Sequence, residues 1–421
     1  MKSDQPDVAR LERAWRNGRG LGERFANAWN FARHLLDNRM LGGAQSRVQI
    51  AILLRGGVGD VMIAARWLRT AFDAMAESAD FVADLYYALP ENIAFIFGNF
   101  SEVRYVYHEI TFEYIRGYYD FHFVINHLGY IEMDVDHAGD LPFKELVRSW
   151  GPGVEMFSPF TTDDYHPDLG RNFAGLIERL GFRRHTILEA QTGLKAPVAP
   201  FPFRLPPRSE ISALELPAAP YVTVHDGWDA QLRIGSRRPT KAWPTDRWAD
   251  LMAHIKRASP GVGVVQIGGR AGANIPGVDL DLKGAISLPV AARVLRGAAA
   301  HVDTDSGLVH VAASLGTRAV VIFGPTDRTY FGYPGNLNLA SDACRSCWLK
   351  TGNWVDSCMI GDVRPRCMTG VEPGAVATAL AELLKRVLSA RSSDRTSPSA
   401  ARSRSLRRSD KGRGQGDCRR R

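Results

Sequence analysis

The sequence opens the same pattern of secondary structure twice, and this repetition is what most constrains its fold. Residues 48–54 are an apolar run, followed by glycines and then by a helix-like stretch over residues 61–75. The pattern restarts at residues 221–225, and later apolar runs again alternate with helix-like segments. Strands that alternate with helices predict a parallel sheet covered on both faces. We therefore expect an α/β chain with two doubly wound domains.

Length and composition agree with this division. A single core rarely grows beyond about 250–300 residues, so a chain of 421 residues is expected to divide. Hydrophobic residues make up 45% of the chain and charged residues 23%, as in ordinary globular proteins. We predict, in order, an N-terminal helical extension (1–47), a first Rossmann-like domain (48–195), a proline-rich linker (196–220), a second Rossmann-like domain (221–340), a cysteine-bearing segment (341–371), a C-terminal helix (372–388) that could cross back onto the first domain, and a tail (389–421).

The tail carries the basic character of the chain. Residues 389–421 hold eleven Lys and Arg against three Asp and Glu, which equals the net charge of +8 of the whole chain. The tail is rich in Ser, Arg and Gly and contains almost no apolar residues, a composition that predicts disorder. Such a tail could bind nucleic acid or an anionic membrane surface, but a solvated extension is favoured, so we expect no specific nucleic-acid partner. Without a visible signal segment or apolar span, we expect a cytoplasmic protein, with peripheral contact at the inner membrane left open.

The first glycine turn ends in an acidic residue. Residues 53–60 read Leu-Leu-Arg-Gly-Gly-Val-Gly-Asp, which does not have the glycine spacing of a dinucleotide site. Asp60 falls in the first turn of the predicted helix, where a carboxylate can simply cap the helix. It also falls at the carboxyl edge of a sheet, where α/β folds bind ligands, so it is a candidate functional residue.

Two segments of the second domain carry groups suited to phosphates. Residues 236–244 include Ser236 and Lys241, which could neutralise and bind a diphosphate, although a solvated basic loop is an equal alternative. Residues 303–310 follow a strand and open a helix whose free N–H groups favour an anion. There Asp305, Ser306, Gly307 and His310 are candidates, against an N-cap aspartate and a core histidine. Taken together, the two segments predict a diphosphate ligand.

In this order, the segments resemble the glycosyltransferase family of the bacterial heptosyltransferases, family 9. The shared features are the Gly-Asp turn at residues 54–60, the Lys-Ala-Trp-Pro segment at 241–244, residues 286–313 and the Phe-Gly-Pro-Thr-Asp segment at 323–327. The resemblance covers roughly residues 48–385 and is dense over 221–330.

The resemblance implies a GT-B fold, in which two Rossmann-like domains face each other across a cleft. It also implies inverting transfer from ADP-heptose or a related nucleotide sugar, with no metal or other cofactor in catalysis. By the same resemblance, Asp60 is the general base, Ser236, Lys241, Ser306 and Gly307 hold the diphosphate, and His310 lies beside it. Asp305 would contact the donor sugar and Ile286 the base. The acceptor stays open among a glycan, a lipid-linked core sugar such as that of lipopolysaccharide, and a protein.

Four cysteines lie close together after the second domain. The spacing of Cys344, Cys347, Cys358 and Cys367 suits a tetrahedral thiolate site for structural zinc or iron, with four free thiols as the alternative. The segment resembles the cysteine finger of autotransporter heptosyltransferases, which binds iron. Its expected role is structural or in oligomerisation.

Two other functions fit the same architecture. A nucleotide-sugar 2-epimerase would need acidic residues and a histidine in the cleft, and a non-catalytic scaffold would need neither. Relatives also carry an acidic residue after the strand that ends at Gly269, where this chain has Arg270, so the donor's base is left open.

Overall fold

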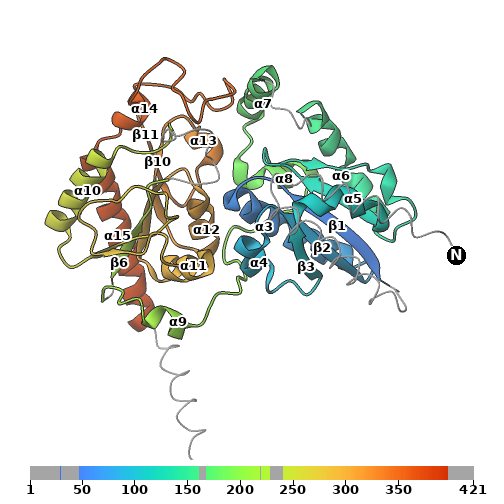
Figure 1. Ribbon diagram of the computed structural model, residues 1–421, viewed down its shortest axis with the longest axis horizontal. Coiled ribbons are helices and arrows are strands. Elements are labelled where there is room, and N and C mark those ends of the chain that lie inside the picture. The colour runs from blue at the N-terminus through green and yellow to red at the C-terminus, as the bar shows by residue number, and fades with distance from the viewer. Residues whose placement is uncertain (1–28, 30–46, 161–166, 219, 228–239, 397–421) are drawn as a thin grey trace, which may run out of the picture.

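The structure is a computed structural model that describes residue 29 and residues 47–160, 167–218, 220–227 and 240–396. Ser236, most of the predicted N-terminal extension, and residues 397–421 of the predicted tail lie outside these described residues. The chain folds into two α/β lobes that lie side by side, with α3 and α12 between their sheets (Figure 1). Both lobes alternate strands and helices, as the sequence predicts.

The first lobe is built on a five-stranded sheet in the order β3-β2-β1-β4-β5, in which β5 alone is antiparallel to its neighbour. β1 lies at the centre because its run of Val, Ile and Leu is buried on both faces, as a central parallel strand requires. The strands are β1 (Val48–Leu54), β2 (Phe81–Tyr87), β3 (Val103–His108), β4 (Phe121–Ile125) and β5 (Ile131–Glu132), and the helices are α3 (Val58–Ala76), α4 (Pro90–Phe97), α5 (Phe112–Ile115), α6 (Lys144–Phe157), α7 (Pro167–Leu180) and α8 (Ile187–Thr192).

The second lobe has a six-stranded parallel sheet in the order β11-β10-β9-β6-β7-β8. Its strands are β6 (Tyr221–Val224), β7 (Gly263–Gln266), β8 (Leu280–Asp281), β9 (Ala300–Thr304), β10 (Ala319–Phe323) and β11 (Leu337–Ala340). Its helices are α10 (Thr245–Ala258), α11 (Leu288–Gly297), α12 (Gly307–Leu315), α13 (Arg328–Phe331), α14 (Arg366–Thr369) and α15 (Pro373–Thr396). β1 in the first sheet and β6 in the second are the strands from which the strand order runs outward in both directions. Folds of this kind bind ligands at the carboxyl end of that position.

The C-terminal helix corrects two expectations. Helix α15 packs against α10, and Val376, Leu380 and Leu383 join the core of the second lobe, so the helix does not cross back onto the first domain. It also continues to Thr396, so the predicted end at residue 388 and the predicted disorder of residues 389–396 are wrong. The physical reason is that neither Gly nor Pro occurs between Gly374 and Pro398, and a helix once started propagates through Ser, Ala and Arg.

The linker between the lobes is a packed strap with one short helix, α9 (Arg208–Ser212). Phe201 and Phe203 are buried in it, and the Phe203 ring stacks on Phe95 of α4 with a centroid distance of 5.8 Å. The backbone N–H of Phe201 donates to the carbonyl of Ser314 in α12, at 3.0 Å. The linker is therefore fixed to both lobes and sets how they meet.

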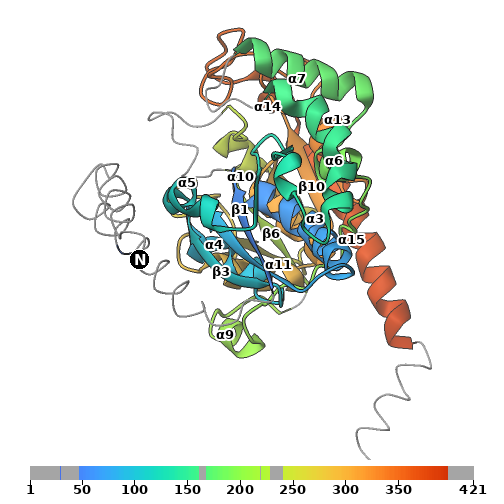
Figure 2. The same ribbon diagram turned by 90° about the vertical axis from the view of Figure 1, so that its right-hand side faces the viewer.

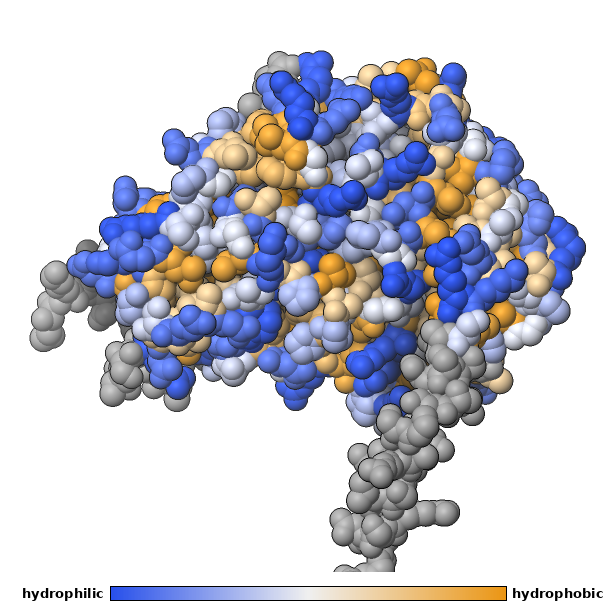
Figure 3. Space-filling model, turned by 180° about the vertical axis from the view of Figure 1, so that it is seen from behind, coloured by the Kyte–Doolittle hydropathy of each residue, from blue (hydrophilic) through white to orange (hydrophobic). Residues whose placement is uncertain are grey.

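A second bridge joins the lobes on the other side. Helix α7 lies beside the cysteine-bearing segment in both ribbon views (Figures 1 and 2). The Trp348 ring of that segment contacts Phe173 of α7 at 6.0 Å and stacks on Tyr330 of α13 at 5.1 Å. Among the described residues, no helix is long and apolar enough to cross a bilayer. On the face shown in Figure 3, polar and apolar residues are mixed.

Candidate active site

Asp60 stands at the first turn of α3, directly after the carboxyl end of β1. Gly56 makes the turn with a φ of +103°, a conformation that favours glycine, and a Cβ there would lie 2.3 Å from an oxygen of Asp60. The N–H of Gly57 donates to Asp60 Oδ2 at 2.8 Å. Asp60 thus caps the helix, as the plainer alternative predicts, but its side chain keeps 28% exposure. Capping and a chemical role are therefore compatible.

Arg184 holds the other oxygen of this carboxylate, a contact that the sequence analysis missed. It lies in a 3-10 turn (Arg184–Thr186) and forms an ion pair with Asp60 Oδ1, while also donating to the carbonyl of His127 at 3.1 Å. Its side chain is 3% exposed. Burial opposes the charge, but the Asp60 carboxylate outweighs it, so the pKa of Arg184 is raised.

A cavity of about 500 Å³ lies beside this turn. It sits at the carboxyl edge of the first sheet and includes Gly56, whose neighbour in space is the Asp60 carboxylate. Tyr87 helps to shape the edge, because its hydroxyl donates to the carbonyl of Gly56 at 3.1 Å. The cavity is lined by Leu53, Leu54, Arg55, Gly56, Tyr87, Ala88, Glu109 and Glu113. It is large enough for a sugar-sized group next to the carboxylate.

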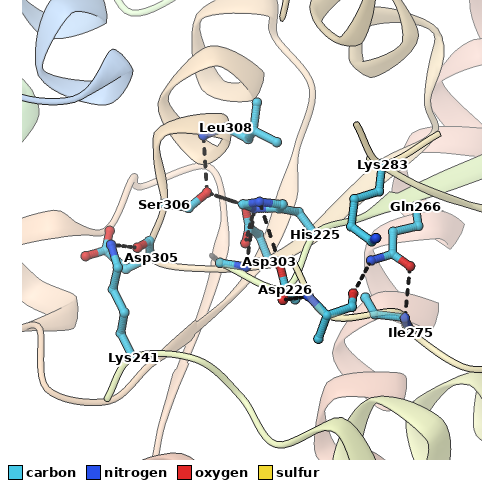
Figure 4. Close-up of polar contacts among 12 residues, drawn as sticks. His225, Asp226, Lys241, Gln266, Ile275, Lys283, Asp303, Asp305, Ser306 and Leu308 are labelled. Carbon is cyan, nitrogen blue, oxygen red and sulfur yellow. Dashed lines mark hydrogen bonds and ion pairs between the residues drawn. The ribbon is translucent and has the colours of Figure 1, made fainter. Parts of the chain in front are cut away.

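In the second lobe, β9 runs into the loop that starts α12. Ser306 is the N-cap of α12 and accepts from the N–H of Leu308 at 3.2 Å, so a serine takes the capping position expected of an aspartate. Its hydroxyl donates to Asp303 (Figure 4). The hydroxyl therefore points into the protein, and what the loop offers a ligand is the amino end of α12, where the helix dipole favours an anion.

A buried polar network supports this loop. His225, which follows β6, places its Nδ1 3.0 Å from Asp303 (Figure 4). His301 of β9 places its Nε2 3.1 Å from the same carboxyl. All three side chains are buried. Burial raises the pKa of Asp303, but His225 and His301 lower it by more, so that the net pKa is about 2. This carboxyl therefore stays ionised. The network fixes Ser306 and hence the first turn of α12.

Lys241 reaches the same loop from the segment before α10. Its ammonium donates to the backbone carbonyl of Asp305 at 2.9 Å (Figure 4). Asp305 is buried, and that burial raises its pKa even though Lys241 opposes the shift. The structure thus brings Lys241, Asp305, Ser306 and Gly307 together. Ile286 is half-buried in the turn before α11 and packs at the edge of the apolar core.

The two halves of the site meet where α3 and α12 touch. A Cβ on Gly59 would lie 2.5 Å from the His310 ring and 3.2 Å from the backbone of Gly307, so the amino ends of both helices are in contact. Asp60 is close enough to His310 and Asp305 to influence the pKa of both. The predicted carboxylate and the predicted phosphate loop therefore face each other across the contact between the lobes.

His310 is buried in this contact. Its Nδ1 lies 2.8 Å from the hydroxyl of Tyr333, whose ring stacks on His185 of the first lobe at 4.7 Å. Burial, with Arg184 and Arg66 nearby, lowers the pKa of His310 to about 3. Burial and the charges of Arg66 and Arg183 lower that of His185 to about 4. Both imidazoles are therefore neutral at physiological pH.

The four cysteines line one cavity of about 200 Å³ in the described chain. All four are free thiols, and burial together with the other three cysteines raises the pKa of Cys367 to about 12. Among the described residues, no three His, Cys, Asp or Glu side chains are arranged to hold a metal ion. The predicted ligands Cys344, Cys347, Cys358 and Cys367 are thus gathered but not set in coordination geometry.

Known proteins match this arrangement most clearly in its second half. Residues 230–352 match the model of glycosyltransferase family 9 (heptosyltransferase). The resemblance seen in the sequence is thereby confirmed. The family 9 segment contains Lys241, Ile286 and the loop at the start of α12, whereas Asp60 and Arg184 lie outside it.

A curated protein and several solved structures are similar to this chain. Lipopolysaccharide heptosyltransferase 1 of Pseudomonas aeruginosa is 32% identical over 183 residues, 40% of this chain and 49% of that protein. The aligned part thus spans about half the length of this curated relative. The iron-containing dodecameric glycosyltransferase TibC of enterotoxigenic Escherichia coli is 17% identical, with a TM-score of 0.50 over 80% of each chain. The E. coli ADP-heptose heptosyltransferase II is 18% identical, with a TM-score of 0.45 over 80% of this chain and 99% of that one. Together with the two mainly parallel sheets, the likeness to TibC identifies a GT-B fold.

Proposed function

We propose that this chain is an inverting glycosyltransferase that transfers a sugar, heptose by preference, from a nucleotide-diphosphate sugar such as ADP-heptose. The observation that carries the proposal is the contact between α3 and α12, which brings the first turn of α3, with Asp60, against the amino end of α12. Lys241 binds the carbonyl of Asp305 in the loop that starts α12. A base on one side and a cationic, amide-lined loop on the other is what transfer from a diphosphate requires. The family match over residues 230–352 supports this assignment.

In the proposed reaction, Asp60 accepts the proton of an acceptor hydroxyl in the cavity beside Gly56. The hydroxyl oxygen forms a bond to the anomeric carbon while the bond between that carbon and the diphosphate oxygen breaks. The electron pair of that bond goes to the diphosphate, where Lys241 and the N–H groups of Ser306 and Gly307 stabilise the negative charge. Asp305 is proposed to contact the sugar, Ile286 the base and His310 the phosphates. Ser236 is proposed as a further phosphate contact.

The acceptor is proposed to be a glycan, a lipid-linked sugar or a protein hydroxyl that enters the cavity of about 500 Å³ next to Asp60. We propose that the enzyme acts in the cytoplasm, where nucleotide sugars are made, and that the basic tail could hold it at the inner membrane. Both proposals rest on the sequence.

The cysteine-bearing segment is proposed to hold one structural iron or zinc ion. The support is that its four thiols line a shared cavity and that thiolates are the ligands that these metals accept in tetrahedral sites. Cys344, Cys347, Cys358 and Cys367 would hold the ion. Its role would be to fix the segment that bridges the lobes, which contacts the first lobe through Trp348 and Phe173. The same segment holds Thr240, next to Lys241, whose hydroxyl donates to the carbonyl of Trp354 at 2.7 Å.

Turnover of ADP-heptose, measured as ADP released with and without lipopolysaccharide-core acceptors, tests the proposal. Asp60→Asn should lower the transfer rate by about 10²- to 10⁴-fold, as expected for loss of a general base. Lys241→Ala should lower it by about 10²- to 10³-fold through loss of charge stabilisation. The matched controls are Asp73→Asn on the exposed side of α3 and Lys256→Ala on α10, which should keep full activity.

Three outcomes would separate the alternatives. Conversion of UDP-GlcNAc to its 2-epimer, with ADP-heptose left untouched, would favour the epimerase. Binding of neither sugar nucleotide in calorimetry would leave a scaffold. Full activity of Asp60→Asn would remove Asp60 as the base.

A further inference from the structure

Three consecutive residues tie the base to the contact between the lobes. Arg183 donates to the carbonyl of Thr329 in the second lobe at 3.2 Å, Arg184 pairs with Asp60, and His185 stacks on Tyr333. This short segment, residues 183–185, belongs to the first lobe but touches both the carboxylate and the second lobe. Its middle residue, Arg184, pairs with the carboxylate that is proposed above as the general base.

Arg184 is held in place more tightly than an ordinary surface arginine. Its guanidinium lies against Gly129, where a Cβ would fall 1.6 Å from Nη1, so any side chain at that position would displace it. Its Nη1 is buried without a hydrogen-bond partner, while Nη2 serves both Asp60 and the carbonyl of His127. Burying a charged group with an unsatisfied N–H is costly, and a nearby carboxylate offsets this cost. Asp60 is the carboxylate with which Arg184 is paired.

The second lobe completes this burial. Tyr330 of α13 lies near Arg184, because each influences the pKa of the other, and its hydroxyl lies 3.5 Å from the carbonyl of Leu128. The guanidinium is thus enclosed by the first lobe on one side and by α13 on the other. Water is kept from the guanidinium while the lobes are together, whereas the Asp60 carboxylate stays partly exposed.

The geometry of the carboxylate leaves room for an acceptor. Arg184 binds Oδ1 and the N–H of Gly57 binds Oδ2, so two of the roughly four lone-pair positions of an ionised carboxylate are in use. The side chain still keeps 28% exposure. These two bonds fix the rotation of the carboxylate without closing it to a third donor.

We propose that Arg184 is a positioning residue for Asp60, which holds the carboxylate in one orientation toward the cavity beside Gly56. This role rests on the proposed function, because only in the proposed sugar transfer does Asp60 accept a proton. Arg184 itself need not touch the substrate. It acts through the orientation of its partner.

The test compares Arg184→Met and Arg184→Lys with the wild type in the pH dependence of sugar transfer from ADP-heptose. Loss of a cation within about 4–6 Å lets a carboxylate gain a proton more easily, by roughly one pH unit or more. Arg184→Met should therefore lower the rate about 10- to 100-fold and move its acidic limb to higher pH. Arg184→Lys keeps the charge and should restore most of the pH profile but only part of the rate. Arg183→Met, which removes the neighbouring charge, should leave the profile in place.

A double variant keeps the idea testable if Arg184→Met also loosens the fold. If Arg184 acts through Asp60, adding Arg184→Met to Asp60→Asn should cost no further activity beyond Asp60→Asn alone. If the two losses multiply instead, Arg184 acts independently and the proposal is wrong. An unchanged acidic limb in both Arg184 variants would also overturn it.

A direct measurement separates this idea from the proposed function. In ¹³C-aspartate-labelled protein, the Asp60 carboxyl signal, assigned with Asp60→Asn, should titrate at higher pH in Arg184→Met than in the wild type. This readout needs no activity. If the wild type transfers no sugar but the signal shifts between the wild type and Arg184→Met, the proposed function is wrong and the role of Arg184 stands. If the wild type is active but the signal does not shift, the role of Arg184 is wrong and the proposed function stands.

Discussion

Gly59→Ala tests whether the observed contact between the lobes is the reactive arrangement. Gly59 is buried in the first turn of α3, where it faces Gly307 and His310. The added Cβ would lie 2.5 Å from His310 Cδ2, well inside the 3.5–4.0 Å at which carbon atoms pack best. His310 has little freedom to move, because it is buried and its Nδ1 is bonded to Tyr333 at 2.8 Å.

Two opposing energies set the size of the effect. Alanine is more favourable than glycine inside a helix by roughly 0.5–1 kcal/mol, and this gain applies whether or not the lobes touch. Overpacking costs about 1–3 kcal/mol, and this cost applies only when the lobes touch. With the lobes in contact the two terms leave a net cost of about 0–2.5 kcal/mol, so the variant should melt like the wild type or somewhat below it. The contact between the lobes should weaken about 5- to 150-fold. We expect kcat/KM for sugar transfer to fall by a similar factor.

The assay pairs donor turnover with small-angle X-ray scattering, in which a loosened contact should increase the radius of gyration. Gly175→Ala is the matched control, since it makes the same helical substitution in α7 with the nearest heavy atom at an ordinary 3.9 Å. It should keep wild-type turnover. If Gly59→Ala melts like the wild type, scatters like it and turns over donor at the same rate, the contact does not matter for the reaction.

Two further predictions concern stability and metal content. The pKa values of His310 and His185 are lowered to about 3 and about 4 in the fold, so between there and about pH 6.5 the unfolded chain binds more protons. The free energy of unfolding should therefore fall as pH drops through this window, by about a few kcal/mol, and His310→Gln should flatten the decline in a series of melting curves; an equally steep decline in that variant would contradict the assignment. Elemental analysis should find about one iron or zinc ion per chain, lost in Cys344→Ser and Cys347→Ser but retained in the tail variant Cys418→Ser; equal metal content in all three variants would rule out the thiolate site.

The parts of the site that the sequence predicted are local. The loop from Asp305 to His310 could be predicted because one strand, one cap and one helix start follow each other in the chain, and their geometry needs no distant partner. Asp60 could be predicted for the same reason. The two strand-and-helix patterns likewise predicted both sheets.

What the sequence could not provide are contacts between residues far apart in it. Arg184 lies 124 positions from Asp60, inside a run of Arg-Arg-His that has no motif, and its burial depends on Gly129 and on the second lobe. His225 and Asp303 are 78 positions apart and pair only because β6 and β9 are neighbours in the sheet. A polar residue at the end of a buried strand was a usable signal for His225. The thiol spacing predicted that the cysteines gather, but side-chain rotation decides whether they coordinate.

The charges buried at the contact also favour an anionic ligand there. Arg66 and Arg184 are both buried on the side of the first lobe, each with an Nη1 that has no hydrogen-bond partner, and Arg66 is bonded to backbone carbonyls such as that of His185. Asp60 pairs with Arg184, and His185 and His310 stay neutral because their pKa values are lowered. On the first lobe, two buried guanidinium groups stand beside one carboxylate, and the positive ends of α3 and α12 meet at the contact. On the second lobe, Asp303 is held by two histidines and burial raises the pKa of Asp305. A diphosphate bound near the amino ends of these helices would interact favourably with them, so donor binding should strengthen the contact between the lobes.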